Sequence, residues 1–312
     1  MQAPNPDQNA YPTLVLSDLH LGHPDAPTPD QLRPLWQDHP HVLFNGDTAE
    51  VQIHHLKDAG RAALDQLQRL LDADGITTTL LAGNHDGILT PKRHHFFHGQ
   101  HTLATHGDAL HPALAPWTHR ATSMAEFTLK HLQHNQHPPS THQDADPDQH
   151  PSIPAPHLLE DRLRIANDAS HIDFAEHPHP TSNRWLALRK PLMIPRVLLY
   201  WHRLPTYCVR FLERYAPESR ILLFGHSHHP GVWQRDPYTL INTGSFTFPG
   251  HPRAIRVFAD HLTVHRIHQR PDATYALNPE PRPPPRHPCL RRSPHRPPHP
   301  PTPRRHLRIV NP

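Results

Sequence analysis

Cysteine is scarce in this chain of 312 residues, which also lacks any long apolar run. Its two cysteines, Cys208 and Cys289, provide neither a disulfide framework nor a zinc-binding spacing. No segment has an uncharged apolar stretch long enough to span a bilayer, and residues 1–11 lack the cationic and apolar regions of a signal peptide. These absences favour a cytoplasmic protein, with contact at the inner face of a membrane left open.

Lysine is scarce as well, because only four of the 31 basic residues are lysines. The 35 histidines and 41 prolines are spread along the whole chain, which indicates a general compositional bias. A histidine outside a recognisable motif is therefore interpreted as a surface residue. The formal net charge of +3 is small and does not by itself argue for a nucleic-acid partner.

Five short apolar segments each lead into polar residues that can bind a metal ion. The first runs from Leu14 toward Asp18 and His20, and alternate residues of an extended segment point to the same side. A carboxylate and an imidazole that converge in this way suit a divalent cation. Four later segments repeat the pattern, with glycine beside the polar residue in each. Because sites in open α/β sheets form beyond the carboxyl ends of strands, we expect one common site.

In chain order, the five segment ends read Asp-Leu-His, Gly-Asp, Gly-Asn-His-Asp, His-Gly-Asp and Gly-His-Ser-His. This ordered set, over residues 18–228, resembles the calcineurin-like metallophosphoesterase superfamily and has no substitution at a ligand position. The resemblance implies a four-layer α/β/β/α sandwich with a helical cap insertion and two divalent metal ions. The ligands that it implies are Asp18, His20 and His228 for one ion, Asn84, His106 and His226 for the other, and Asp47 between the two.

The chemistry implied by the resemblance is hydrolysis of a phosphate ester by a metal-bridging hydroxide that attacks phosphorus in line. Phosphoryl transfer to water needs an activated water, neutralised phosphate oxygens and a stabilised leaving group, and a two-metal site supplies all three. Oxygen and nitrogen donors without thiolate suit manganese, iron, magnesium or zinc and do not select among them. Manganese is the metal that we expect.

His85 directly follows an expected metal ligand, and the resemblance implies that it contacts the phosphate and protonates or supports the leaving oxygen. An imidazole in this role usually needs a carboxylate to orient it. In the protein phosphatases of the superfamily, that acid lies three residues after the bridging aspartate. Glu50 has this spacing from Asp47, and Asp86 is the competing candidate. Those phosphatases carry arginine directly after the acid, whereas Val51 stands here, which counts against a serine/threonine protein phosphatase.

Three neighbouring residues have weaker signals. Asp108 is expected to hold backbone or an imidazole of the site. His229 is expected to point away from the metals, because it follows a ligand by one residue. Ser245 stands after glycine at the end of a predicted strand, where it either contacts phosphate or belongs to a plain turn.

The periodicity of apolar residues predicts a mixed α/β chain. Strands are predicted at 13–17, 41–46, 76–82, 102–105, 221–224, 239–242, 254–258 and 262–267. Helices are predicted at 30–38, 51–71, 113–133 and 157–176. The stretch 183–215 is predicted to form short helical pieces that are broken at Pro191, Pro195 and Pro205.

Composition divides the chain into a metallophosphoesterase domain at 12–270 and a Pro/Arg-rich tail at 271–312 that we expect to be disordered. The domain contains a helical and low-complexity insertion at 113–216, in which 134–156 is also expected to be disordered. The apolar and arginine-rich part of the insertion, 183–215, is either a set of helices packed on a sheet or a cap over the site. A cap of this composition would suit an anionic substrate with an apolar part.

The insertion is similar in placement to the helical cap of the UDP-2,3-diacylglucosamine pyrophosphatases, although those enzymes carry arginine where this chain has His85. The predicted function is hydrolysis of a phosphomonoester, phosphodiester or pyrophosphate bond, with such a lipid-linked sugar nucleotide as one candidate substrate. A phosphodiesterase or nuclease is the alternative enzyme, and a non-catalytic binding scaffold is the alternative of another class. The expected partners are a small phosphorylated substrate and, through the cap or tail, a membrane surface or lipid; nucleic acid stays open.

Overall fold

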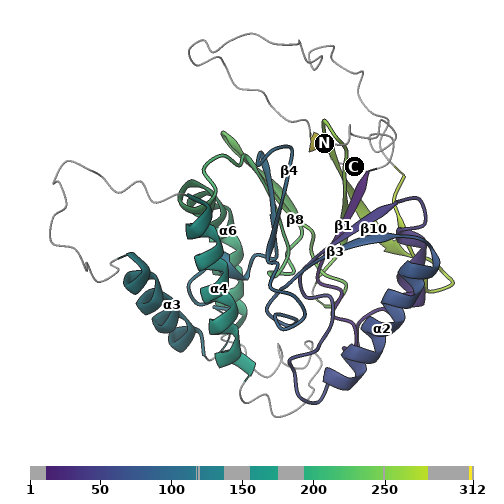
Figure 1. Ribbon diagram of the computed structural model, residues 1–312, viewed down its shortest axis with the longest axis horizontal. Coiled ribbons are helices and arrows are strands. Elements are labelled where there is room, and N and C mark those ends of the chain that lie inside the picture. The colour runs from purple at the N-terminus through teal and green to yellow at the C-terminus, as the bar shows by residue number, and fades with distance from the viewer. Residues whose placement is uncertain are drawn as a thin grey trace, which may run out of the picture.

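Two β-sheets pack face to face in the middle of the molecule, and helices cover the outer face of each sheet (Figure 1). The computed structural model describes residues 12–116, 118, 120–136, 155–174, 193–248, 250–279 and 309–310. The layers follow the order α/β/β/α, as the resemblance implies. Among the described residues, no helix combines the length and the apolar character that crossing a membrane requires.

The first sheet joins strands from both ends of the chain in the order β11-β10-β9-β1-β2-β3. Its strands β1, β2 and β3 are parallel, with β3 at the edge, whereas β9 runs antiparallel to β1, and β12 pairs with β10. The strands are β1 (Thr13–Leu16), β2 (His41–Asn45), β3 (Thr77–Leu81), β9 (Arg253–Val257), β10 (Leu262–Gln269), β11 (Tyr275–Leu277) and β12 (Ile309–Val310).

The second sheet has the order β4-β5-β6-β8-β7, with parallel pairing among its three central strands and antiparallel strands at both edges. The strands are β4 (His94–Phe97), β5 (Thr102–Thr105), β6 (Ile221–Phe224), β7 (Gly231–Arg235) and β8 (Tyr238–Asn242). In both sheets the parallel strands end on the same side, which brings five motif-bearing loops together.

The helices fall into two groups (Figure 1). Those of the first sheet are α1 (Pro29–Leu32), the 3-10 turn Arg33–Leu35 and α2 (Lys57–Ala73). Those of the second sheet are the 3-10 turn Asp108–Leu110, α3 (Ala121–Gln136), α4 (Ala155–Phe174) and α6 (Met193–Tyr215). All three long helices of the second group belong to the predicted insertion, so the insertion supplies the outer layer of that half.

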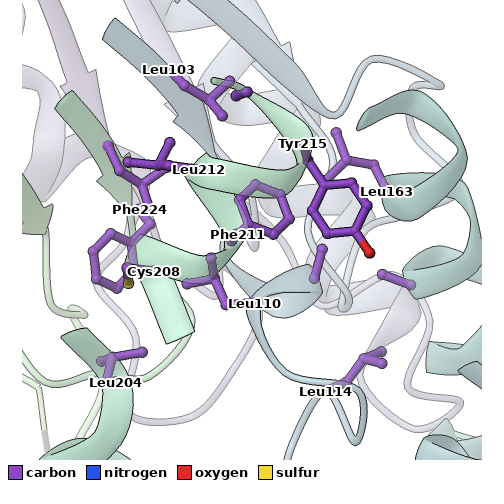
Figure 2. Packing of buried hydrophobic residues seen from close by; sticks show 14 of the residues in the cluster. Leu103, Leu110, Leu114, Leu163, Leu204, Cys208, Phe211, Leu212, Tyr215 and Phe224 are labelled. Carbon is purple, nitrogen blue, oxygen red and sulfur yellow. The ribbon is translucent and has the colours of Figure 1, made fainter. Parts of the chain in front are cut away.

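Three apolar clusters separate the four layers. Between the sheets lie Val15, Leu43 and Leu223, all without solvent exposure. A second cluster joins the first sheet to α2, and the third joins the second sheet to α4 and α6. Figure 2 shows the third cluster, in which Phe211 and Leu212 of α6 lie among strand and helix side chains. Burial of each such large side chain contributes about 1.5–3 kcal/mol, which fixes the sheets beneath the site.

The helix α6 corrects one prediction, because it runs without a break from Met193 to Tyr215. Pro195 lies in its first turn, where a backbone N–H needs no partner within the helix. Pro205 lies inside the helix and removes one backbone hydrogen bond. Leu204 and Cys208 on either side of it are fully buried, so packing holds the helix together there. Pro191 lies outside the described residues.

Several predicted boundaries also change. The helix α2 begins at Lys57 rather than at 51, and α3 begins at Ala121 rather than at 113. The strands β4, β7, β11 and β12 were not predicted; β4 reads His-His-Phe-Phe, without alternation of polar and apolar residues. The strand β11 lies inside 271–312, the segment that was predicted to be a tail. Most of that tail, and most of 134–156, lies outside the described residues.

Candidate metal centre

The loops that follow β1, β2, β3, β5 and β6 bring the predicted ligand side chains into two groups. The first cluster consists of Asp18, His20 and His228, whose ligand atoms lie within 4.8 Å of one another. In the same way, Asp47 groups with His106 and His226. We call Asn84, His106 and His226 the second cluster, and Asp47 lies between the two clusters.

Short distances connect the first cluster. The Nε2 atoms of His20 and His228 are 3.1 Å apart, and His228 Nε2 is 3.5 Å from Asp18 Oδ1. Asp18 is fully buried, and burial is the main reason that its pKa rises to about 6. Ser17 donates its hydroxyl to Asp18 Oδ2 at 2.5 Å, and the backbone N–H of His226 donates to Oδ1 at 2.9 Å. These donors fix the carboxylate in place.

The second cluster converges on one amide oxygen. Asn84 Oδ1 is 3.1 Å from His106 Nε2 and 2.9 Å from His226 Nδ1. His106 Nε2 is also 3.1 Å from Asp47 Oδ2, which links this cluster to the bridging carboxylate. The outer nitrogens of both rings face backbone carbonyls, at 3.2 Å for His106 to Asn45 and 3.1 Å for His226 to Leu114.

His226 provides a test of whether a cation fits here. Burial lowers the pKa of His226 to about 4, so the ring is neutral at pH 7 and carries a single N–H. Its two nitrogens nevertheless each face an oxygen acceptor, those of Leu114 and Asn84. Only one of these two contacts can be a hydrogen bond. In the other, a nitrogen lone pair faces an oxygen lone pair, which is unfavourable unless both atoms bind a cation. A divalent metal ion fits this donor set of nitrogen and oxygen atoms.

The backbone of the site is strained. Asp18, His20, Asp47, His226 and His228 all have positive φ angles, between 51° and 62°. A residue other than glycine held in this region costs about 1–3 kcal/mol, and such strain gathers at functional sites. The strain also corrects the argument from alternation: β1 ends at Leu16, and the next two ligands converge through left-handed turns rather than through an extended segment.

The glycines beside the ligands allow close approach. A Cβ atom on Gly83 would lie 2.2 Å from Asp47 Oδ1, and one on Gly225 would lie 1.9 Å from Asp18 Oδ2. Real contacts of a Cβ atom are never this short. Glycine is therefore required where the third and fifth motif loops pass the two carboxylates.

Glu50 holds two imidazoles at once. Its Oε1 accepts from Nδ1 of His20, and its Oε2 accepts from Nδ1 of His85, both at 2.7 Å. Burial raises the pKa of a carboxyl, but the two imidazoles outweigh burial and lower the pKa of Glu50. Burial lowers the pKa of His85, but Glu50 and Asp47 raise it to about 10. The structure thus brings the predicted Glu50–His85 pair together and adds a contact to the first cluster that was not predicted.

Asp86, the competing candidate for the partner of His85, binds backbone N–H groups. Its carboxylate accepts backbone N–H groups from Asp47 at 3.3 Å, from Thr48 at 2.6 Å and from Gly83 at 2.6 Å. These bonds tie the second motif loop to the third. Asp86 therefore shapes the backbone beneath the site.

The weaker candidates have structural contacts. Ser245 donates to the backbone carbonyl of Asp18 at 3.3 Å and accepts from the N–H of Thr247 at 3.0 Å, which makes it part of a turn. The ring of His229 stacks on Trp201 at a centroid distance of 4.4 Å. Asp108 accepts from the N–H of the next residue, as expected of a backbone contact, but its main partner is a buried guanidinium, that of Arg93. Sequence reasoning missed Arg93, because it stands in no motif.

The chain matches no protein-family model and no curated protein. Solved structures with a similar fold include a dimetal phosphatase from Danio rerio, at 13% identity and a TM-score of 0.41, over 86% of this chain and 98% of that one. Vacuolar Protein Sorting 29 from Cryptosporidium parvum is another, at 12% identity and a TM-score of 0.38, over 86% and 96%. A third is described as a predicted phosphoesterase from Streptococcus pneumoniae, at 12% identity and a TM-score of 0.35, over 86% and 97%.

At these identities and TM-scores, the similarity assigns no substrate and no residue role to this chain. The layer order, the shared edge of the strand ends and the two clusters stand on the structure itself. The layer order agrees with the four-layer sandwich that the resemblance of the five motifs implies, and no comparison singles out the UDP-2,3-diacylglucosamine pyrophosphatase branch.

Proposed function

We propose that this chain is a phosphohydrolase that depends on two divalent metal ions. The observation that carries the proposal is the convergence of seven oxygen and nitrogen donors in two clusters that share Asp47. Cations held there would neutralise phosphate oxygens and activate water. The donor set does not choose among manganese, iron, zinc and magnesium, and manganese is the first to test.

The proton for the leaving group is assigned to His85. Its Nδ1–H is bound to Glu50, and with a pKa of about 10 the ring also carries a proton on its other nitrogen. The side chain is 23% exposed, so a substrate can reach it, whereas Glu50 behind it is buried. In this proposal Glu50 holds the ring in orientation, and His85 donates its second proton to the departing oxygen.

The test measures bound metal and hydrolysis in the same preparation. Protein stripped of metal by a chelator is reloaded with Mn²⁺, its metal content is determined by elemental analysis, and cleavage of bis(4-nitrophenyl) phosphate is followed. Two ions per chain and cleavage that Asp47→Asn abolishes would support the proposal. A folded wild type that retains no ion would overturn it and favour the non-catalytic scaffold.

The finer proposal names a lipid-linked sugar nucleotide, such as UDP-2,3-diacylglucosamine, as the substrate. The helix α6 supports this because Ile194, Leu198 and Leu199 are exposed, at 47–54%, near the exposed cations Arg196 and Arg203. Apolar side chains flanked by arginine suit an anionic ligand with acyl chains or the surface of a membrane that holds it. Cleavage of this compound by the Mn²⁺-loaded protein, in parallel with the generic diester, is the test. Cleavage of the diester alone would favour the phosphodiesterase or nuclease alternative.

A further inference from the structure

One guanidinium connects the insertion to two loops of the metal centre. Arg93 is buried, at 6% exposure, and its NH1 donates to Asn167 Oδ1 of α4 at 2.8 Å and to the backbone carbonyl of Gly83 at 3.4 Å. Its NH2 forms an ion pair with the carboxylate of Asp108. Gly83 directly precedes Asn84 of the second cluster, and Asp108 follows His106 by two residues.

The contact between α4 and the third motif loop is close. A Cβ atom on Gly87 would lie 2.1 Å from Asn167 Oδ1, so any other residue at that position would displace the Asn167 amide. Gly87 is two residues beyond His85. The amide of Asn167 therefore lies against the loop that carries both Asn84 and His85, and its oxygen accepts from Arg93 there.

A second side chain of α4 reaches the remaining ligand of the second cluster. Arg162 is buried, at 3% exposure, and its NH2 donates to the backbone carbonyl of His111 at 3.1 Å. The same carbonyl accepts the backbone N–H of Leu114 at 3.0 Å and so closes a turn. Leu114 has a φ of 51°, and its own carbonyl faces His226 Nε2 at 3.1 Å. Arg162 thus holds the turn that orients His226.

Together these contacts lead from one helix to all three members of the second cluster. Burying a guanidinium is costly unless its hydrogen-bond partners are well placed, so two buried arginines at one helix restrict how that helix and the loops can move. In the first cluster, by contrast, the orienting partners of His20 and Asp18 are Glu50 and Ser17, which belong to the sandwich.

We propose that α4 positions the second cluster through Asn167–Arg93 and Arg162–His111, so that the insertion sets the affinity for the second metal ion. The inference rests on the proposed function, since it presupposes two bound ions. Asn167, Arg93 and Arg162 are positioning residues that do not touch the ion. Loss of a partner that orients a metal ligand typically weakens metal binding about 10–100-fold.

The experiment is a calorimetric titration of Mn²⁺ into the metal-free full-length protein, with the number of ions and both dissociation constants as the readout. Asn167→Ala removes the acceptor for Arg93, whereas Asn167→Asp keeps an acceptor and serves as the conservative rescue. Asp168→Ala, next along α4, is the matched control, because among the residues that the structure describes its carboxylate pairs only with the exposed Arg164, at 3.7 Å. His20→Ala and His106→Ala give reference titrations in which one cluster has lost a ligand.

We expect Asn167→Ala to weaken one of the two ions about 10–100-fold and to resemble His106→Ala rather than His20→Ala. Asn167→Asp and Asp168→Ala should match the wild type. If Asn167→Ala does not fold, judged by its thermal transition, Arg162→Met is expected to give the same selective loss. Unchanged affinities, or equal weakening of both ions, would overturn the inference and leave the proposed function standing. A wild type without bound ions would overturn both.

Discussion

The two clusters of the metal centre are held in different ways, although they share one carboxylate. In the first cluster, all three residues have left-handed backbone, and His20 is oriented by the charged side chain of Glu50. In the second cluster, Asn84 and His106 are free of that strain, and the outer ring nitrogens face the carbonyls of Asn45 and Leu114. The first cluster is oriented by a carboxylate of the sandwich, whereas the second cluster is oriented by loops that contact α4 of the insertion.

This difference has an energetic consequence. Hydrogen bonds to a carboxylate are roughly twice as strong as those between neutral groups. Because the orienting partners of the first cluster belong to the sandwich, that cluster should stay in place when the insertion moves, whereas the second cluster, whose loops contact α4, should move with the insertion. Substitution of the residue that both clusters share should affect both metal positions, whereas substitution of a residue that contacts one cluster should affect that cluster alone.

The largest effect is expected at the shared residue. Asp47→Asn removes the negative charge that lies 3.1 Å from His106 Nε2 and 3.9 Å from His20 Nε2, and so weakens both metal positions. We expect hydrolysis to fall about 10²–10³-fold, as when an electrostatic element of an active site is lost. Titration with Mn²⁺ should show weaker binding of both ions. A variant that keeps two tight ions would contradict the bridging position of Asp47.

Glu50→Gln should affect the first cluster and His85 together. His20 and His85 face different oxygens of Glu50, and glutamine keeps an acceptor at only one of the two positions. The NH₂ group at the other position would force the imidazole there into the opposite tautomer. Hydrolysis should fall about 10²–10⁴-fold, the range for loss of general acid catalysis. The first ion should bind about 10–100-fold more weakly. The second ion should be unaffected.

Steady-state kinetics and Mn²⁺ titration on the same protein check this prediction, with Glu160→Gln on the exposed side of α4 as the control. An equal loss of both ions would show that Glu50 supports the site as a whole. Unchanged metal binding with slow hydrolysis would restrict its role to His85.

A smaller effect is expected from Ser17→Ala, which removes the hydroxyl that donates to Asp18 Oδ2. A single hydrogen bond to a charged group contributes about 1.5–3 kcal/mol, so the affinity for the first ion should fall roughly 10–100-fold or less. Ser219→Ala is a matched control, because Ser219 is also buried but donates to the carbonyl of Gln100. If the control and Ser17→Ala weaken the ion equally, the effect comes from general destabilisation.

Much of the site could be predicted from the sequence because its ligands are local to strand ends. A strand that ends in a polar residue is recognisable from a few letters, and parallel strands deliver their ends to one edge of a sheet. Asp18, Asp47 and His106 are all brought together in this way. The partner of His85 was indicated by the resemblance to the superfamily's protein phosphatases, in which the orienting acid has the spacing that Glu50 has from Asp47.

The rest depends on packing between distant segments. The second contact of Glu50 requires a particular orientation of His20, and Arg93 meets Asn167 from 74 residues away in sequence. Neither contact is indicated by a local pattern in the sequence. The continuity of α6 through Pro205 likewise comes from its buried side, which outweighs the local preference of proline to end a helix. The insertion is therefore the part of the molecule that sequence reasoning described least well.

The smallest effect is expected at the contact between α6 of the insertion and Ser227 of the fifth motif. Trp201 of α6 donates its indole N–H to the carbonyl of Ser227 at 3.0 Å, and Ser227 stands between His226 and His228. Trp201→Phe removes this one bond but keeps a ring to stack on His229. Stability should fall by about 1 kcal/mol, measured by urea denaturation, with both ions retained. A selective loss of the second ion would instead show that α6, like α4, helps to position the second cluster. His226, which directly precedes Ser227, is the member of that cluster that Trp201 would then affect.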